Sequence, residues 1–305
     1  MKLLGKIIFA IIIFTVTNSY SQDPYFSQFY SNPLSLNPAF AGSAGCSRVV
    51  LNYRLQWPKL SGNYKTFSAS YDQYSNSVKG GLGFSYMYDA SGDILFSHYA
   101  NVFYSYNIKC SENFIVKPAV NIGFGRKSID ESKLFGPLYL PNNPRYYFNV
   151  GAGALFIYKN LIGGFAFDHI NEPNESFFDS LGSAKLPMKF TAHVSCQFDI
   201  KDKLKITPVV IYLQQQNFKA IIPSVLFNVW YIKFGVGLRT GFNNPDSFIS
   251  MIGFQNNKFS IGYSYDYVIS KLSNATGGSH EISAVFKFNC KNKTDKFIVP
   301  QLNGF

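Results

Sequence analysis

Four histidines are the side chains in this sequence best suited to acid–base chemistry: His98, His169, His193 and His280. A hydrolase or acyltransferase needs a nucleophile, a base and an orienting group in one hydrogen-bonded set. His280 precedes Glu281, but adjacent residues of a β-strand point to opposite faces. No motif with a known catalytic mechanism surrounds any of the four. We therefore expect that the protein is not an enzyme.

Metal and cofactor motifs are also missing from the sequence. It contains no HxxxH, HxH or EF-hand spacing, and acidic residues are sparse. Glycine pairs such as Gly81 and Gly83 lack the surrounding strand–GxGxxG–helix unit of a dinucleotide site. We expect neither a cofactor nor a metal.

Alternating apolar and polar residues indicate the elements that position the other side chains. In 258–268, Phe259, Ile261, Tyr263, Tyr265 and Tyr267 alternate with Ser, Gly and Asp residues. The chain has 31 Phe and 21 Tyr, and only 15% of its residues are charged, against about 25% in soluble proteins. A secreted β-sandwich would also alternate. Long strands, aromatic strand ends and polar, Gly-rich opposite faces favour a transmembrane β-barrel.

Fourteen antiparallel strands are expected in this all-β barrel. Their ranges are 48–57, 64–72, 79–88, 94–109, 113–126, 146–159, 161–170, 188–200, 203–213, 217–229, 231–240, 246–255, 258–269 and 279–289. Connections after even-numbered strands are tight, and the longest ones, 127–145 and 171–187, follow odd-numbered strands. Because bacterial barrels have short periplasmic turns and long outer loops, this alternation predicts that both ends of the mature chain lie in the periplasm.

The beginning of the chain predicts export. Lys2 and Lys6 precede the apolar run 7–16, which is too short for a membrane-spanning helix, and Ser19 and Ser21 suit a cleavage site before Gln22. The predicted regions are a signal peptide (1–21), an N-terminal extension (22–47), the barrel (48–289) and a periplasmic tail (290–305). The location is then the outer membrane. A net charge of +11 points to lipid headgroups, lipopolysaccharide or lysine and arginine in the lumen, and not to nucleic acid.

The N-terminal extension is irregular but not a plain solvated tail. Prolines at 24, 33 and 38 exclude a regular helix or strand. Five aromatic residues indicate that it packs on something. We expect it in the lumen or under its periplasmic mouth, as a plug.

Charged residues of the strands are expected to face the lumen, because a charge facing lipid costs roughly 2–4 kcal/mol at the bilayer midplane. A structural network of ion pairs and docking of the extension or a partner are both open roles for them. Arg54 and Glu281 lie on the first and last strands, so a pair across the seam is a hypothesis. By alternation, the inward charges are Arg48, Arg54, Asp72, Lys117, Lys189, Asp199, Lys205, Lys233, Arg239, Asp266, Glu281 and Lys287.

The four cysteines are too scattered for a disulfide scaffold, and no CxxC is present. Cys46 precedes the first strand and Cys290 follows the last, so a closed barrel brings both to the periplasmic rim. A disulfide between them is a hypothesis, with Cys110 as a competing partner at the same rim. Cys196 is expected to face lipid.

Several motifs are similar to those of a known family. The run from Gln22 to Gly45 resembles the start of mature PorP/SprF proteins, membrane proteins associated with type IX secretion in Bacteroidota. Matching elements follow in order: Arg54 with Gln56 and Trp57, the Gly81–Gly83 run with Asp89 and Gly92, GYSYD at 262–266 and GSHEI at 278–282. The resemblance covers nearly the whole mature chain. The loops 127–145 and 171–187 carry no matching motif.

The resemblance implies a barrel that helps to secrete, or to hold at the surface, a large adhesin with a type IX sorting domain. It also implies contacts with periplasmic lipoproteins of the secretion and motor machinery. A passive solute channel is the alternative function. Long outer loops, with Pro137, Pro141 and Pro144 beside aromatic residues, are candidates for partner recognition. The residues expected to contact the plug or a partner are Phe26, Phe29, Tyr30, Asn37, Arg54, Trp57, Tyr139, Tyr146, Asp266 and Glu281.

Overall fold

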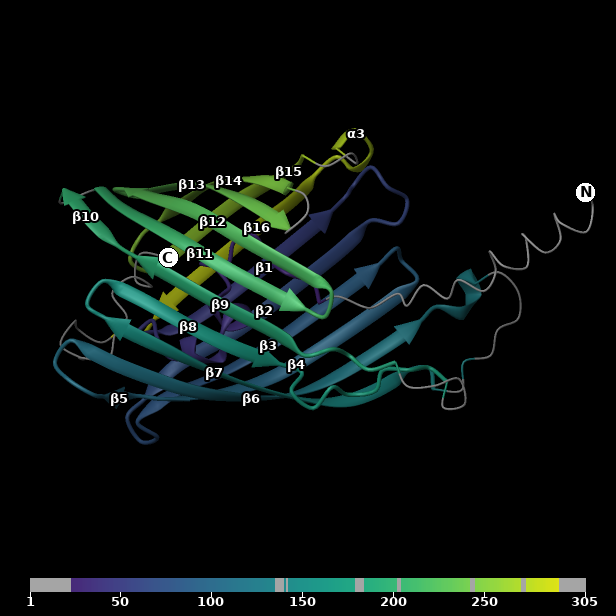
Figure 1. The fold of residues 1–305 in the computed structure, drawn as a ribbon, viewed down its shortest axis with the longest axis horizontal. Helices are drawn as coiled ribbons and strands as arrows, with labels where there is room; N and C mark the ends of the chain where they lie inside the picture. The colour runs from purple at the N-terminus through teal and green to yellow at the C-terminus, as the bar shows by residue number, and fades with distance from the viewer. Residues whose placement is uncertain are drawn as a thin grey trace, which may run out of the picture.

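The computed structural model describes residues 23–134, 140, 142–178, 184–201, 204–241, 245–269 and 273–290. Their strands form one antiparallel sheet that closes on itself (Figure 1), because β1 pairs with β16 and β9 pairs with β11. The predicted signal peptide, Gln22 and residues 291–305 lie outside the described residues. Closure satisfies the backbone polar groups of every strand, which a sheet needs in order to cross lipid.

Sixteen strand segments of the described chain make up fourteen spans. Asn107 alone separates β4 from β5, which both pair with β6, and Gln197 alone separates β9 from β10, which both pair with β11. The predicted fourteen-stranded antiparallel barrel is therefore confirmed. The segments are β1 (Ser47–Gln56), β2 (Tyr64–Ser75), β3 (Gly80–Ser91), β4 (Leu95–Tyr106), β5 (Ile108–Lys109), β6 (Phe114–Ile129), β7 (Arg145–Tyr158), β8 (Leu161–Asp168), β9 (Lys189–Cys196), β10 (Phe198–Lys201), β11 (Leu204–Gln215), β12 (Phe218–Val229), β13 (Ile232–Gly241), β14 (Pro245–Gln255), β15 (Phe259–Val268) and β16 (Ser279–Phe288).

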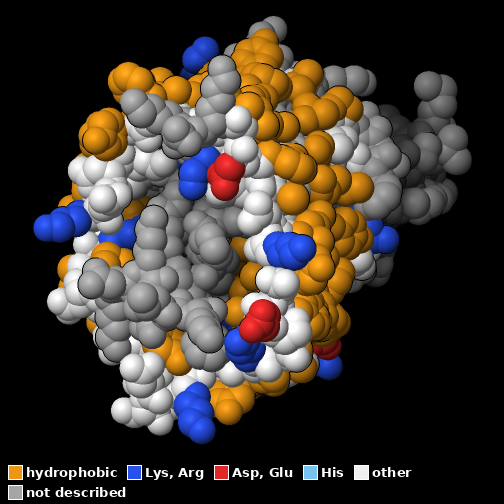
Figure 2. Space-filling model, turned by 90° about the vertical axis from the view of Figure 1, so that its left-hand side faces the viewer, with side chains coloured by type: hydrophobic (Ala, Val, Ile, Leu, Met, Phe, Trp, Pro, Cys, Tyr) orange, Lys and Arg blue, Asp and Glu red, His pale blue; other side chains and the backbone are white. Residues whose placement is uncertain are grey.

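Alternation along each strand separates the outside of the wall from the lumen. In β15, Ile261 and Tyr263 are 44% and 39% exposed, whereas Ser264 and Asp266 are 0% and 1% exposed. Figure 2, which looks along the barrel from the left of Figure 1, shows hydrophobic side chains over the outer wall and Lys and Arg side chains near the rim. Among the described residues, no helix has the length and hydropathy to span a membrane.

The two ends of the barrel differ in their connections. At one end the connections are short: 76–79, 110–113, 159–160, 202–203, 230–231 and 256–258. We call it the short-turn end, and it lies on the left in Figure 1. The other, the long-loop end, carries the connections 130–144 and 169–188 and the short helix α3 (Ser273–Thr276). The connections 92–94, 216–217 and 242–244 are exceptions there, with two or three residues each.

The N-terminal extension lies inside the barrel. We call residues 23–45 the plug; it contains one turn of α-helix, α2 (Pro33–Leu36), and one turn of 3-10 helix, η1 (Pro38–Phe40). The hydrophobic core forms between the plug and the wall. Its buried plug members are Phe29, Tyr30, Leu34, Ala39, Phe40 and Ala41, which cluster with wall residues such as Phe103, Leu155, Ile211 and Leu226.

The path of the plug corrects one prediction, namely that both ends of the mature chain lie at the periplasmic end. Asp23 instead lies at the long-loop end, where its N–H donates to Gln215 at the end of β11. Gly42 lies near the short-turn end, where its N–H donates to Asp72 in β2. The plug therefore runs through the whole lumen. The prediction failed because no pattern in residues 22–47 shows which wall residues bind them.

Candidate functional site

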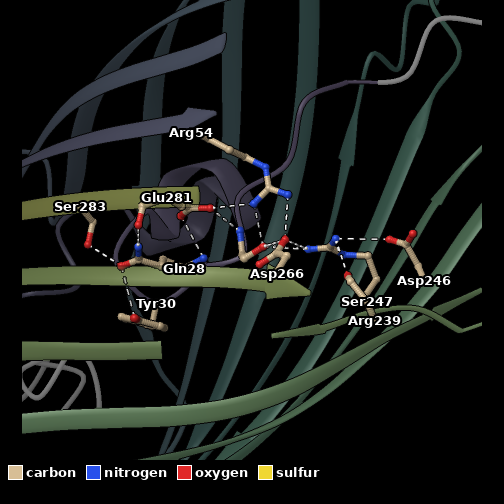
Figure 3. A network of polar contacts seen from close by, with 10 residues as sticks. Gln28, Tyr30, Arg54, Arg239, Asp246, Ser247, Asp266, Glu281 and Ser283 are labelled. Carbon is tan, nitrogen blue, oxygen red and sulfur yellow. Dashed lines mark hydrogen bonds and ion pairs between the residues drawn. The ribbon is translucent and has the colours of Figure 1, made fainter. Parts of the chain in front are cut away.

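A network of buried charges binds the plug to four strands (Figure 3). The N–H groups of Ser27 and Gln28 donate to the two carboxylate oxygens of Glu281 at 2.7 and 3.0 Å. Ser27 Oγ donates to Asp266 Oδ2 at 2.7 Å. All of these side chains are at least 98% buried. Hydrogen bonds to ionised groups are stronger than neutral ones, so this network holds the plug firmly.

Two arginines complete this network. Arg54 lies opposite Glu281 in the β1–β16 register, and its guanidinium contacts Glu281 at 3.2 Å and Asp266 at 2.8 Å. Arg239 reaches Asp266 at 3.0 Å and Asp246 at 3.3 Å. The structure thus brings together Arg54, Glu281 and Asp266. Arg54 and Glu281 meet across the seam, as the seam hypothesis expected, and Arg239 adds a cation from β13.

A second set of contacts holds the plug near the short-turn end. Arg48 and Asp72 form a bidentate pair with distances of 2.8 and 3.0 Å, and both are about 1% exposed. The carboxylate of Asp72 also accepts from the N–H of Gly42. The backbone oxygen of Ala41 accepts from Lys117 Nζ at 3.2 Å. These wall charges bind backbone atoms of the plug, so the plug sequence alone does not indicate them.

Asn37 fixes the middle of the plug to the opposite wall. Its side-chain amide donates to the backbone oxygens of Ala154 and Phe165 at 3.1 and 3.0 Å. Its Oδ1 accepts from the N–H of Ala39, which caps η1. A Cβ on Gly153 would lie 2.5 Å from Asn37 Oδ1, and one on Gly81 would overlap Ala41 O. These two glycines therefore allow close approach of the plug.

The outer end of the plug is held by a third set of contacts. Asp23 Oδ2 lies 2.7 Å from His169 Nε2 and 3.3 Å from Lys189 Nζ. Burial alone would raise the pKa of Asp23, but the charges of His169 and Lys189 outweigh it and lower this pKa. Burial alone would lower the pKa of His169, but the charge of Asp23 raises it. We call the Asp23–His169 contact the outer latch.

The remaining predicted contact residues lie in several places. Phe26, Phe29 and Tyr30 are buried in the lumen. Trp57 lies at the long-loop end, where its ring packs edge-on against Tyr64 with centroids 5.6 Å apart. Tyr146 belongs to β7 and not to a loop; it is 52% exposed on the outer wall and stacks on Phe124. Tyr139, Pro137 and Pro141 lie outside the described residues.

Two of the charges expected to face inward lie at the rim of the barrel. Asp199 and Lys205 have side chains that are 56% and 41% exposed, and they pair at 3.8 Å near the short-turn end. Both keep the predicted inward side of their strands, because Gln197 and Thr207, two residues further into the barrel, are 5% and 0% exposed, whereas Phe198 and Ile200 are 50% and 53% exposed on the outer wall.

Two of the four cysteines form a disulfide and two do not. Cys46 and Cys290 form a disulfide between residues 244 positions apart, which closes the seam beside the entry of the plug. Cys110 and Cys196 are free. His98 and His280 each contact a tyrosine hydroxyl, of Tyr86 and Tyr263 respectively. Within the described ranges, no group of His, Cys, Asp and Glu side chains could hold a metal.

The plug leaves two cavities beside its first residues. One, with a volume of about 130 Å³, extends along the wall and is lined by Phe29, Leu34, Phe103 and Ile211 with Asn101 and Asn121. The other, of about 690 Å³, lies at the long-loop end above the charge network and is lined by Arg54, Arg239 and Asp266. Asp23, Pro24 and Tyr25 border both cavities. Both cavities thus lie beside the outer part of the plug, whereas Phe40, Ala41 and Ala44 nearer the short-turn end are buried.

Comparison with known proteins supports this architecture. The structure of the Ralstonia pickettii toluene transporter TbuX is similar with a TM-score of 0.53 and 11% identity, over 85% of this chain and 94% of that chain. The Acinetobacter baumannii outer membrane protein Omp33 has a TM-score of 0.48 and 10% identity, over 80% of this chain and all of that chain. No curated protein sequence matches. At such low identity the likeness to TbuX shows the fold alone.

The sequence also matches a family model, described as the type IX secretion system membrane protein PorP/SprF, over residues 18–286. This match covers the plug and almost the entire barrel. The motifs at 22–45, 262–266 and 278–282 lie within it and supply residues of the buried network, including Ser27, Gln28, Asp266 and Glu281. The chain therefore belongs to the PorP/SprF family of type IX secretion outer-membrane β-barrels.

Proposed function

We propose that this barrel helps to secrete a large surface protein with a type IX sorting domain, or holds it at the cell surface. The observation that carries the proposal is the plug. It spans the lumen and is bound by charged side chains near both ends and by Asn37 in the middle. A solute pathway would need open space in the part of the lumen that the hydrophobic core between plug and wall occupies. The plug therefore favours a function in which a protein partner binds at the ends of the barrel.

The orientation assigns the partners to the two ends. Because bacterial barrels have long outer loops and short periplasmic turns, the long-loop end faces the surface and is expected to bind the secreted adhesin. The short-turn end faces the periplasm and is expected to contact lipoproteins of the secretion and motor machinery. The apolar outer wall contacts lipid, and lipopolysaccharide surrounds its outer rim. No catalytic step is part of this function.

Site-specific photo-crosslinking followed by affinity capture tests the proposal. One crosslinker replaces Lys59, an exposed residue of the long-loop end, and a matched one replaces Asn257, an exposed residue of the short-turn end. We expect the Lys59 position to capture a secreted sorting-domain protein and the Asn257 position to capture periplasmic lipoproteins. An unrelated tagged porin from the same membranes is the control. If the Lys59 and Asn257 positions capture the same proteins, the proposal is wrong.

Passive solute passage is the alternative function. The two cavities beside the outer part of the plug favour it, because they give solutes space to enter the barrel. It requires a continuous opening to the short-turn end, where Phe40, Ala41 and Ala44 of the plug are buried. Conductance of the full-length barrel separates the two functions, as described in the Discussion.

A further inference from the structure

The cavity of about 690 Å³ at the long-loop end is large enough for several side chains of another protein. We call it the vestibule. Its floor is the charge network around Arg54 and Asp266, and its walls come from both sides of the barrel seam. Tyr25 of the plug borders it, with its ring 4.5 Å from the Arg239 guanidinium carbon. The vestibule is therefore a preformed concave site at the end that is expected to face the surface.

The vestibule is acidic although the protein is basic. Five carboxylates line it against three cations: Asp23, Asp89, Glu175, Asp246 and Asp266, with Arg54, Lys127 and Arg239. Each of these cations already forms an ion pair with one of the carboxylates, at 2.8 to 3.3 Å. The net charge of the whole chain is +11. Asp23 is paired with His169 and Lys189, which lie outside this lining, so among the described residues Asp89 is the lining carboxylate without an ion pair. A ligand that complements the vestibule therefore carries positive charge.

Asp89 is the carboxylate with capacity for a further cation. Its oxygens accept from Thr66 Oγ1 at 2.6 Å and Ser91 Oγ at 3.4 Å. Within the described part of the chain, no Lys, Arg or His forms an ion pair with it, whereas Asp23 in the same cavity has two such partners. An ionised carboxylate can accept about four hydrogen bonds, so Asp89 retains acceptor capacity.

Aromatic rings lie next to this carboxylate. In the β2–β3 register Asp89 pairs with Thr66. Tyr64, two residues before Thr66, lies on the same face of the sheet and nearer the long-loop end. Trp57 packs against Tyr64 and also lines the vestibule. The N–H of Trp57 donates to Gly278 O at 2.9 Å, which holds its backbone at φ 58°. A carboxylate beside aromatic faces is a favourable environment for a cationic side chain.

We propose that the vestibule binds a lysine- or arginine-bearing segment of the secreted partner. This inference rests on the proposed function for the identity of the occupant. The cationic side chain reaches Asp89, and the neighbouring residues of the segment pack on Trp57 and Tyr64. A metal ion lacks a ligand set here, because no group of three His, Cys, Asp or Glu side chains among the described residues could hold one.

Tryptophan fluorescence gives a direct test, since Trp57 and Trp230 are the two tryptophans of the chain. Trp230 lies between β12 and β13 at the short-turn end and is 66% exposed. Trp230→Phe leaves Trp57 as the reporter in the vestibule. The full-length variant in detergent is titrated with a capped Gly-Lys-Tyr-Lys-Gly-Ser peptide and with the same peptide carrying Glu in place of Lys.

We expect the lysine peptide to shift the Trp57 emission and the glutamate peptide to have no effect. Adding Asp89→Asn should weaken binding by about tenfold or more, because a hydrogen bond between two charged groups is lost. Asp93→Asn is the matched control, because it makes the same charge change on the turn after β3. Asp93 is exposed, and it pairs with Lys65 outside the vestibule. It should bind as the parent does.

Two outcomes would overturn the inference: equal binding of both peptides, or an Asp89→Asn variant that binds as tightly as Asp93→Asn. The peptide titration and the crosslinking experiment can refute the vestibule site and the proposed function independently. Loss of peptide binding while Lys59 still captures a sorting-domain protein removes only the vestibule as its site. Peptide binding without any captured surface protein supports the vestibule as a site for cationic side chains and removes the proposed function.

Discussion

Substitution of the buried Asp72 tests whether charge pairs of the wall stabilise this barrel. Asp72 accepts two hydrogen bonds from Arg48 and one from the N–H of Gly42. Asp72→Asn removes the negative charge and leaves the Arg48 guanidinium, 1% exposed, without a counter-charge. Breaking a buried pair in this way costs about 3–5 kcal/mol, so the folding equilibrium should fall by about two to four orders of magnitude.

The assay is a urea titration of the barrel folded in lipid vesicles, followed by tryptophan fluorescence. Asp93→Asn is the control, because Asp93 and its partner Lys65 are 53% and 39% exposed and surface pairs contribute little. The double variant Arg48→Met with Asp72→Asn should recover part of the lost stability, since the Arg48 charge is removed together with its partner. If Asp72→Asn and Asp93→Asn unfold at the same urea concentration, the reasoning is wrong.

Three further predictions follow from the plug and its anchors. In planar bilayers the full-length barrel should conduct little, and deletion of residues 23–44 should produce large conductance steps; equal conductance of both would contradict a plugged lumen. Alkylation without reduction, followed by mass spectrometry, should modify Cys110 and leave Cys46 unmodified; Cys46→Ser with Cys290→Ser should lower the unfolding free energy by about 2–4 kcal/mol, and Cys110→Ser should not. In NMR titrations His169 should titrate above 6.5, its ordinary value, and Asp23→Asn should lower that midpoint. The charged form of His169 therefore stabilises the outer latch fully below pH 6.5, and this stabilisation is lost as the pH rises through the raised pKa. The lowered pKa of Asp23 acts in the opposite direction: its contribution is complete above pH 3.8 and is lost as the pH falls through the lowered value.

Most of the wall could be predicted from the sequence, because strand alternation is a local property. Ile261 and Tyr263 face outward and Asp266 faces inward, as period-2 patterning requires. The position of Arg54 opposite Glu281 also followed, since the first and last strands of a closed barrel are neighbours. Asp199 keeps the inward side of its strand as predicted, but its side chain is 56% exposed because it lies at the end of the barrel.

The contacts of the plug could not be predicted in the same way. The outer latch joins residues 146 positions apart, and Asp23 belongs to no periodic pattern. Arg239 was expected to face inward, but its pairing with Asp266 depends on the curvature that brings β13 and β15 together around Ser27. Tyr146, at the start of its predicted strand, was expected to contribute to a recognition surface, but it lies on the outward face of β7.

The amino-acid sequence by itself determined the barrel, its strand number, its inward charges and the presence of an irregular segment that must pack. These depend on residue type and spacing along single strands. Only the tertiary structure decided that the plug crosses the lumen from the short-turn end to the long-loop end. The tertiary structure is needed because side chains from many strands bind the plug. Those side chains come close to one another only when the barrel closes.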